Sequence, residues 1–402
     1  MSRKTGLWLI GAFGGVSTTV AVGLAALKNN SCQNIGLVSG LPDFDQLDLV
    51  DWSNIVLGGH DIRDTNVAIE AEKLCRGTTP VFAPEYVAQA KIELEQFNDN
   101  ICPGVTINAG KAIDDISDNG HFFAANNCNS AIEKIQSDLQ KFKAANHCDR
   151  VIVINLASTE PPVETDAIPN EPAAFSKFLD DPACSIPPSS LYAYAAIDIG
   201  MPFVNFTPSI ANRIPAICKL AEEKNVCHMG HDGKTGETFL KSVLAPAFAQ
   251  RNLNIMSWVG HNIFGNMDGV ILDDPENKKT KVDSKGLMLN QMLGYQPQSH
   301  ISIEYIKSLG DWKTAWDHIH FQGFLGTTMT MQFTWQGCDS ILAAPLVLDL
   351  FRFTELANRK GESGLMLHLS SFFKSPMETD DHVFSSQFEK LLNWASKHSE
   401  KS

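Results

Sequence analysis

Short apolar runs alternate with helical patterns along the first half of the chain. The runs are rich in residues that favour β-strands, and they fall at 7–10, 34–38, 54–57, 150–156 and 202–206. Between two of them, Ile132, Ile135 and Leu139 recur at the spacing of one helix face. Residues 160–188, rich in proline and acidic side chains, indicate a long surface loop before a helix at about 191–199. The alternation predicts an α/β fold with a doubly wound parallel sheet covered by helices.

The pattern changes after about residue 250, where strand-like stretches are separated by short helices. The stretches fall at 254–259, 300–306, 316–324 and 327–334. A strongly apolar helix at 341–357 then returns to the first unit. We therefore predict a dinucleotide-binding domain of the Rossmann type at 1–248, an inserted smaller α+β domain at 249–338 and a return to the first domain at 339–402.

The opening stretch, residues 6–27, contains no charge over 22 positions. This length fits a membrane span, and the basic residues before it resemble the start of an export signal. The stretch also divides into a short buried strand, a turn containing Gly11, Gly14 and Gly15, and a helix that begins near Ser17. Such a strand, glycine turn and helix can bind a phosphate, because glycines admit the pyrophosphate and helix amides favour an anion. The pattern alone leaves both interpretations open.

Composition narrows the choice of protein class. The 402 residues carry a net charge of −14, which argues against a nucleic-acid partner. No second apolar run reaches the length of a membrane span. The nine cysteines are scattered and form no Cys-x-x-Cys pair, so they fit neither a disulfide framework nor a zinc site and indicate a reducing cytoplasm. We therefore expect a cytoplasmic enzyme and favour the phosphate-binding interpretation of residues 6–27.

Lysines gather in one stretch of this acidic chain. Six of them lie within 52 residues: Lys234, Lys241, Lys278, Lys279, Lys281 and Lys285. Lys281 and Lys285 are four apart, so a helical turn would direct both ammonium groups toward one anionic substrate. A solvated helix face is the alternative interpretation. The histidines near Asp317 and at 228 and 231 do not complete a tetrahedral set, so no metal is predicted.

Ten short motifs, in order along nearly the whole chain, resemble those of the inositol-phosphate synthase family. They are GAFGGVSTT, LGGHDI, NLASTE, FVNFTPS, HDGKTGETFLKSVL, GHNIFGNMDG, KTKVDSK, LGDWK, CDSILAAP and FFKSP. The family consists of NAD-dependent cyclases that convert glucose 6-phosphate to inositol phosphate. The resemblance implies NAD as cofactor, glucose 6-phosphate or a similar phosphosugar as substrate, and a homotetramer formed through the inserted domain. No membrane partner is expected, because residues 6–27 are explained as the first strand and helix of the fold.

The resemblance also implies roles for individual residues. The glycine turn and the helix start would contact the pyrophosphate through Gly11, Gly14, Gly15, Val16 and Ser17. The rest of the cofactor pocket would be lined by Asp61, Ala157, Thr207, Asp232, Thr235, Asn266, Asp268 and Asp339. The catalytic groups would be Lys281, Lys285, Lys313 and Lys374, with Asp311 in the same element as Lys313. Lys281 and Lys374 would lie beside the sugar's C5 and C1 oxygens, and Lys285 and Lys313 would serve phosphate binding and proton transfer.

Several departures from the family pattern keep other activities open. Gly15 and Val16 replace an Asn-Asn pair, Phe206 stands where glycine is usual, and Ser158–Pro162 replaces a Thr-Glu-Arg-Tyr element. These changes fall in the cofactor half and leave the four lysines in place. The alternatives are a cyclase for another sugar phosphate, a simple dehydrogenase that consumes NAD, and a catalytically silent NAD-binding protein.

Overall fold

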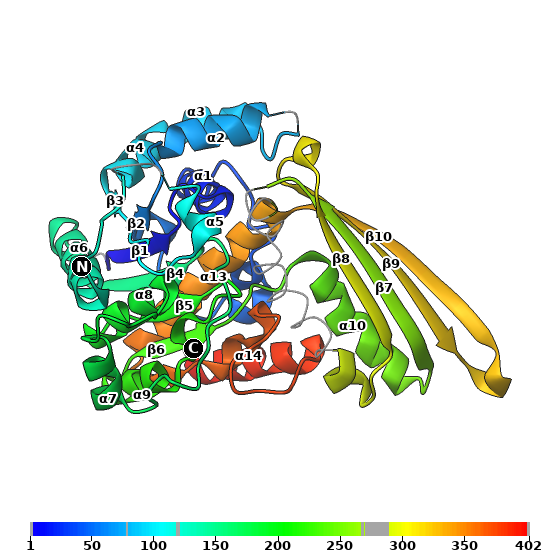
Figure 1. Cartoon of the computed structure of the whole chain (residues 1–402). Helices are drawn as coiled ribbons and strands as arrows, with labels where there is room; N and C mark the ends of the chain where they lie inside the picture. The colour runs from blue at the N-terminus through cyan, green and yellow to red at the C-terminus, as the bar shows by residue number, and fades with distance from the viewer. Residues whose placement is uncertain (1–2, 78, 118–120, 267–268, 270–288, 400–402) are drawn as a thin grey trace.

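The computed structural model describes residues 3–77, 79–117, 121–266, 269 and 289–399. Two separate sheets organise these residues (Figure 1). No helix in these ranges is both long enough and apolar enough to cross a membrane. Residues 6–27 instead form a buried strand and a helix joined by the glycine turn, in agreement with the phosphate-binding interpretation.

The first sheet is parallel throughout, as predicted. Its strands are β1 (Thr5–Ile10), β2 (Ile55–Asp61), β3 (Ile101–Pro103), β4 (Arg150–Asn155), β5 (Phe203–Asn205), β6 (Cys227–Gly230) and β11 (Gly364–Leu365). Their spatial order is β11-β6-β5-β4-β1-β2-β3. The chain order reverses between β1 and β4, and at such a point the connections leave in opposite directions and open a crevice at the carboxyl ends of the strands.

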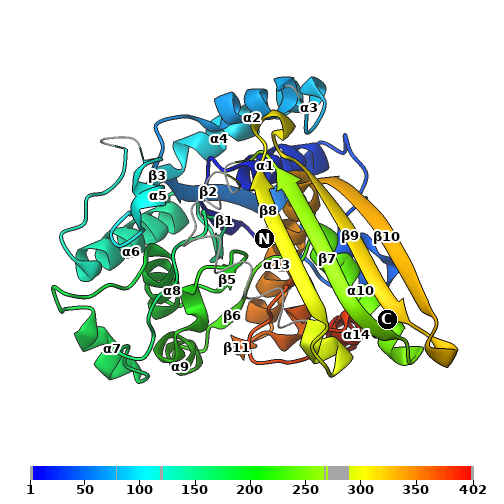
Figure 2. The ribbon, with the colours of Figure 1, turned by 45° about the vertical axis from the view of Figure 1, so that its right-hand side comes forward.

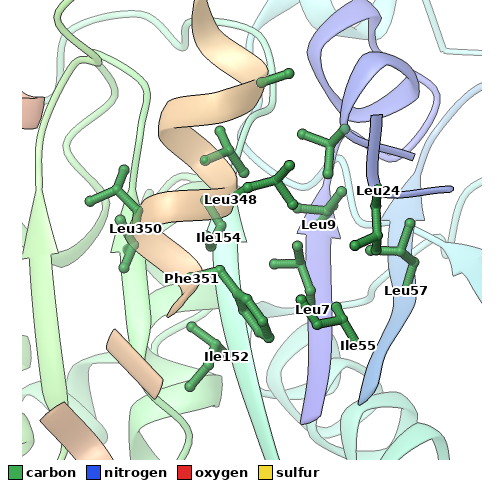
Figure 3. Packing of buried hydrophobic residues seen from close by; sticks show 14 of the residues in the cluster. Leu7, Leu9, Leu24, Ile55, Leu57, Ile152, Ile154, Leu348, Leu350 and Phe351 are labelled. Carbon is green, nitrogen blue, oxygen red and sulfur yellow. The ribbon is translucent and has the colours of Figure 1, made fainter. Parts of the chain in front are cut away.

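Alternation along the central strands divides the core into two layers. Leu7 and Leu9 of β1 pack into one apolar cluster, whereas Trp8 and Ile10 pack into the other. Figure 3 shows the first cluster, where β1, β2 and β4 meet Leu24 and Phe351 from two helices. Its helices are α1 (Gly15–Lys28), α2 (Val67–Arg76), α3 (Pro84–Gln89), α4 (Lys91–Asp99), α13 (Asp339–Arg359) and α14 (Phe384–His398). The opposite layer contains α6 (Cys128–Ala145), α7 (Pro172–Phe178), α8 (Pro188–Asp198) and α9 (Pro215–Glu223), while the short α5 (Lys111–Asp114) adds Ile113 to the buried residues.

The second sheet extends away from the first as four long strands (Figure 2). They are β7 (Asn254–Phe264), β8 (Gln298–Tyr305), β9 (Trp312–Gln322) and β10 (Thr328–Cys338), in the order β10-β9-β7-β8. Strands are therefore present at all four predicted positions. Helix α10 (Gly236–Gln250) packs on one face of this sheet through Ala245 and Phe248. The three-segment division remains a prediction, and α10 shows that a helix from the predicted first segment packs on the second sheet.

Two local predictions are wrong. Residues 34–38 form a turn at Gly36, which has φ +92°, followed by a short 3₁₀ helix (Val38–Gly40) in place of a strand. The amides of Val38 and Ser39 donate to the Asp349 carboxylate at 2.5 and 3.1 Å, so a side chain of α13 satisfies them without a neighbouring strand. Residues 160–188 are not wholly a surface loop either, because they contain α7 and the buried Glu160.

Candidate active site

A cavity of about 490 Å³ opens at the carboxyl ends of β1, β2, β4 and β5, beside the start of α13. Every predicted site residue that the structure describes lines it: Gly11, Gly14, Gly15, Val16, Ser17, Asp61, Ala157, Thr207, Asp232, Thr235, Asn266, Asp311, Lys313, Asp339 and Lys374. The predicted residues Asp268, Lys281 and Lys285 lie outside the described residues. Side chains separated by more than 350 positions thus face one space.

The glycine turn forms a cradle whose surface is backbone. Gly11 has φ +84°, and a Cβ added there would lie 3.0 Å from the Cα of Ala157. A Cβ on Gly15 would lie 2.8 Å from Oγ of Ser340, at the start of α13. The Ser17 hydroxyl donates to the Gly11 carbonyl at 2.8 Å and fixes the turn against the first turn of α1. This close approach leaves room for a pyrophosphate beside the amides of α1, so the residues fit a dinucleotide.

Asp61 braces the cradle from the end of β2. Its Oδ2 accepts a hydrogen bond from the amide of Phe13 at 2.7 Å, within the glycine turn. Its Oδ1 accepts from the amides of Ile62 and Arg63 at 2.8 and 3.0 Å. Arg63 and Lys73 also line the cavity and are both paired with Glu70. Neither Arg63 nor Lys73 was predicted from the sequence. Lys73 reaches the cavity only because helix α2 packs beside it, which the sequence pattern does not reveal.

The ends of β4 and β5 are joined by side-chain amides and a hydroxyl. Nδ2 of Asn155 donates to Oδ1 of Asn205 at 3.1 Å and to Oγ1 of Thr207 at 3.2 Å. Oδ1 of Asn155 accepts from the amide of Ala157 at 3.2 Å. Asn155 and Asn205 are buried, so these bonds hold the predicted contacts Ala157 and Thr207 in fixed positions.

Glu160 is a buried carboxyl group in the cavity wall that the sequence analysis assigned to a surface loop. Its Oε1 accepts from the Ser189 amide at 2.8 Å, and its other oxygen accepts from the Ser189 hydroxyl. Burial raises the pKa of Glu160 to about 7, although the hydrogen bonds from Ser189 and Ser209 oppose the shift. Its position five residues after the end of the buried strand β4 was the available signal, because polar residues that follow strand ends can face the crevice.

Lys374 and Asp232 form an ion pair at the cavity wall. Nζ of Lys374 donates to Oδ1 of Asp232 at 2.8 Å, and the two side chains are 15% and 8% exposed. The Lys374 amide also donates to the Asp232 carbonyl at 2.7 Å. Asp232 has φ +60°, a conformation that is costly for a residue with a side chain and is typical of functional sites. A predicted cofactor contact and a predicted catalytic lysine are therefore one charged unit.

Asp311 holds together three segments around the cavity. Its Oδ2 accepts from the Ser340 amide at 2.8 Å and from the Cys338 thiol at 2.9 Å, and Nδ2 of Asn266 lies 3.5 Å from Oδ1. Burial raises the pKa of this carboxyl group. Nζ of Lys313 lies 5.1 Å from the centre of the Phe264 ring. Asp311 thus joins the second sheet to the start of α13, beside Lys313.

Of the six lysines that gather in the sequence, the structure describes Lys234 and Lys241; the other four, Lys278, Lys279, Lys281 and Lys285, lie outside the described residues. Lys234 is buried against Gln387 and Phe384, and burial lowers its pKa to about 7. Lys241 is fully buried between Glu237 and Asp317, beneath the second sheet. Neither of them lines the cavity. Within the described parts of the chain, no three His, Cys, Asp or Glu side chains are grouped to hold a metal ion.

Comparison with known proteins gives consistent matches over nearly the whole length. A family model described as myo-inositol-1-phosphate synthase matches residues 5–396. The inositol-3-phosphate synthase 1 of Bacteroides thetaiotaomicron is 35% identical over 402 aligned residues, with 94% of this chain and 91% of that protein covered. The inositol-3-phosphate synthase of Dictyostelium discoideum is 29% identical over 377 residues, with 89% and 69% covered.

Solved structures match the fold. Inositol-3-phosphate synthase from Caenorhabditis elegans superposes with a TM-score of 0.88 at 24% identity, covering 99% of this chain and 86% of that one. A myo-inositol-1-phosphate synthase-related protein from Thermotoga maritima gives a TM-score of 0.80 at 22% identity, covering 99% and 100%. Both sheets therefore belong to an architecture already seen in crystals.

Proposed function

Because the chain belongs to the myo-inositol-1-phosphate synthase family, we propose that it converts glucose 6-phosphate to inositol phosphate in an NAD-dependent cyclisation. The observation that carries this proposal is the meeting of Lys374, Lys313 and Asp311 with the glycine cradle in one cavity. A dinucleotide site alone would fit many dehydrogenases. A dinucleotide site with two lysines and a buried carboxyl group also fits a reaction that creates negative charge on a phosphosugar.

The glycine cradle supports NAD as the cofactor. The amides at the start of α1 would face the pyrophosphate, and Gly11 and Gly15 leave the space that side chains would fill. NAD held there would supply reversible hydride transfer at C5 of the open-chain sugar. A ketone at C5 makes the C6 hydrogens acidic, so the resulting enolate can attack the C1 aldehyde. The protein's task is to stabilise the oxyanions and to move protons.

The Lys374–Asp232 pair is suited to the oxyanions. The carboxylate of Asp232 holds the Lys374 ammonium in one orientation before any substrate arrives, so little reorganisation is needed as negative charge develops. Lys313 brings a second cation from β9 to the same cavity. Partial exclusion of water around Lys374 and Asp232 strengthens the interaction of Lys374 with an anion compared with bulk solvent. We assign Lys374 to a sugar oxyanion and Lys313 to the phosphate and proton transfer, with Lys281 and Lys285 completing the set.

Asp311 positions these groups in the proposed mechanism. It accepts hydrogen bonds from the start of α13 and from Cys338, so its carboxyl group fixes the end of β10 beside Lys313. Its raised pKa favours the protonated form more than in water. A carboxyl group in this state can exchange a proton within the cavity.

The decisive assay supplies glucose 6-phosphate with NAD at a concentration far below that of the sugar and measures inositol phosphate by nuclear magnetic resonance. Multiple turnovers without accumulation of NADH are expected, since each hydride returns to the product. NADH that accumulates in proportion to consumed sugar would identify a simple dehydrogenase instead. If the protein cyclises a different hexose phosphate faster than glucose 6-phosphate, that sugar is the substrate. The variant Lys374→Met is the matched negative control, and its NAD affinity checks that the cavity is intact.

We also propose a cytoplasmic homotetramer that assembles through the second sheet. Asp317 of β9 contacts Lys241 of α10, so its neighbour Trp316, which is 43% exposed, points to the opposite face of the sheet. No described helix covers that face in Figure 2. Phe324 and Leu325, at the tip of the β9–β10 hairpin, are 88% and 86% exposed. Exposed aromatic and aliphatic side chains on a broad sheet are typical of protein interfaces. The acidic net charge supports a small-molecule enzyme without a nucleic-acid partner.

A further inference from the structure

Two cysteines from distant segments meet behind the wall of the cavity. Cys128 is the first residue of α6, and Cys184 lies in the segment that leads to α8. The Cys128 thiol donates to the Cys184 carbonyl oxygen at 3.7 Å, so the two residues are in direct contact. Both residues are buried, but Asp181–Ala183 and Ser185 on either side of Cys184 are exposed. The pair therefore lies directly beneath the surface.

The two thiols differ in chemical character. The hydrogen bond from Cys128, and a second one from the Ile186 amide, lower the pKa of the Cys184 thiol. The same contact with Cys184 raises the pKa of Cys128. A thiol with a lowered pKa is the better nucleophile, and a neighbouring thiol can resolve its oxidised form. Cys184 also lies between the exposed residues 181–183 and 185, from which a small oxidant can reach it, so we assign Cys184 as the attacking sulfur and Cys128 as the resolving one.

The pair is connected to the cavity by one asparagine. Nδ2 of Asn108 donates to the carbonyl oxygens of Cys184 and Ile186 at 3.1 and 3.0 Å, and it lies 3.9 Å from Sγ of Cys128. Ala109, the next residue, lines the cavity. Beyond Ile186, Pro188 and Ser189 line it as well, with Ser189 bound by Glu160. A displacement of Cys184 would therefore move the cavity wall at two places, through Asn108 to Ala109 and along the chain to Pro188 and Ser189.

We propose that Cys128 and Cys184 form a reversible disulfide when the protein meets a peroxide, and that this disulfide weakens NAD binding. The Cys184 thiolate attacks one peroxide oxygen, so an S–O bond forms, the O–O bond breaks and the other oxygen leaves as water after protonation. The Cys128 sulfur then attacks the Cys184 sulfur, an S–S bond forms, and the hydroxide leaves as a second water with the Cys128 proton. The two thiols lose two electrons in total, and the peroxide gains them.

The effect on the cavity follows from the length of the new bond. An S–S bond is about 2.05 Å long, much shorter than any contact between two sulfur atoms that are not bonded. Its formation draws Cys184 toward α6 and disturbs the two hydrogen bonds from Asn108. The loss of one such bond in the wall corresponds to roughly a fivefold rise in the Kd for NAD. Thioredoxin-type dithiols would restore the original state.

The chemistry can be tested without reference to the function. The full-length protein is treated with hydrogen peroxide and digested with trypsin without reductant. The cleavage sites place Cys128 in peptide 112–134 and Cys184 in peptide 178–213, each with no other cysteine. A linked pair of these peptides that separates with dithiothreitol is expected. In Cys128→Ser, Cys184 should accumulate as a sulfenic acid that dimedone traps, and Cys184→Ser should give no trapped product at Cys128. Absence of the linked peptides would overturn the proposal.

The coupling to the cavity rests on the proposed NAD site and has its own readout. Isothermal titration should show a higher Kd for NAD after oxidation of the wild type and of Cys218→Ser, but not of Cys128→Ser. Cys218 is a suitable control because its thiol donates to the Asn212 carbonyl at 3.2 Å and its pKa is raised to about 11 by burial. Linked peptides with an unchanged Kd would overturn the coupling. No NAD binding by the reduced protein would instead count against the proposed function.

Discussion

Asp232 and Lys374, which are 142 positions apart, are joined twice: by an ion pair of 2.8 Å between their side chains and by a backbone hydrogen bond of 2.7 Å. The backbone bond sets the register of the two loops, and the ion pair then directs the ammonium group. An orientation fixed in this way does not depend on the substrate. The pair therefore contributes preorganisation to the cavity.

The variant Asp232→Asn tests this contribution. It keeps the shape of the side chain and removes the charge that orients Lys374, so we expect kcat to fall roughly 10- to 100-fold. Steady-state kinetics measures the effect, and Asp45→Asn, at an exposed position, is the control. If kcat stays at the wild-type value, the ion pair has no part in catalysis.

Gly11 should tolerate no side chain. Gly11→Ala forces a left-handed conformation on alanine, at a cost of about 1–2 kcal/mol, and adds a contact at 3.0 Å with the backbone of Ala157. Gly361 has nearly the same φ, +83°, with nothing within 4 Å of the added Cβ, so Gly361→Ala isolates the conformational cost. Urea denaturation and NAD titration should show a larger loss of both stability and NAD affinity at Gly11. Equal losses of stability and unchanged NAD affinity would contradict the proposed cradle.

Glu160 should make stability depend on pH. Burial raises its folded-state pKa to about 7, above the ordinary value of 4.5, so the folded protein holds this proton more tightly than the unfolded chain. Its stabilising contribution is present below pH 4.5 and is lost as the pH rises toward 7. The Gln side chain of Glu160→Gln does not titrate. As the pH rises from 4.5 to 7, the free energy of unfolding of this variant should therefore increase relative to that of the wild type, by up to about 3 kcal/mol. Urea denaturation at pH 5 and pH 8 measures the gain, and the exposed Glu164→Gln should show none.

Lys241 should be essential for the stability of the second sheet. Its fully buried ammonium contacts Glu237 and lies 3.7 Å from Oδ1 of Asp317. Lys241→Met leaves two carboxylates without this cation, so we expect a loss of about 3 kcal/mol or more in the free energy of unfolding. The control Lys397→Met, at an exposed lysine of α14, should change it by less than about 0.5 kcal/mol. A loss of less than about 0.5 kcal/mol for Lys241→Met would show that Glu237 and Asp317 do not need this cation for stability.

Trp316→Lys tests the proposed assembly. Trp316 lies opposite His261 of β7 and Thr334 of β10, near the middle of the open face, so a cation there should oppose contact with a second copy. Size-exclusion chromatography with light scattering should give a tetramer for the wild type and smaller species for the variant. Ile92, an exposed isoleucine of α4, provides the control Ile92→Lys, which should remain tetrameric. A tetrameric Trp316→Lys would place the interface elsewhere.

The sequence by itself determined the elements whose signal is local. The run at 7–10, the glycines after it and the helix from Gly15 belong together because a buried strand, a tight turn and an apolar helix each depend on neighbouring residues. Every site residue that the ordered motifs predicted and the structure describes lines the cavity, since the carboxyl ends of parallel strands meet at one edge. Residues 34–38 were misjudged because an apolar run does not reveal that Asp349 will satisfy its amides.

Only the tertiary structure decided the pairings. It placed Lys374 beside Asp232, Cys128 beside Cys184, and Lys241 between two carboxylates beneath the second sheet. It also buried Glu160, which sequence composition alone assigned to solvent. Hydrophobic periodicity specifies which face of an element is buried, but the partner of a charge or a thiol depends on the path of loops that connect distant elements. The course of these loops depends on how all the helices and strands pack together, so it cannot be predicted from a short stretch of sequence.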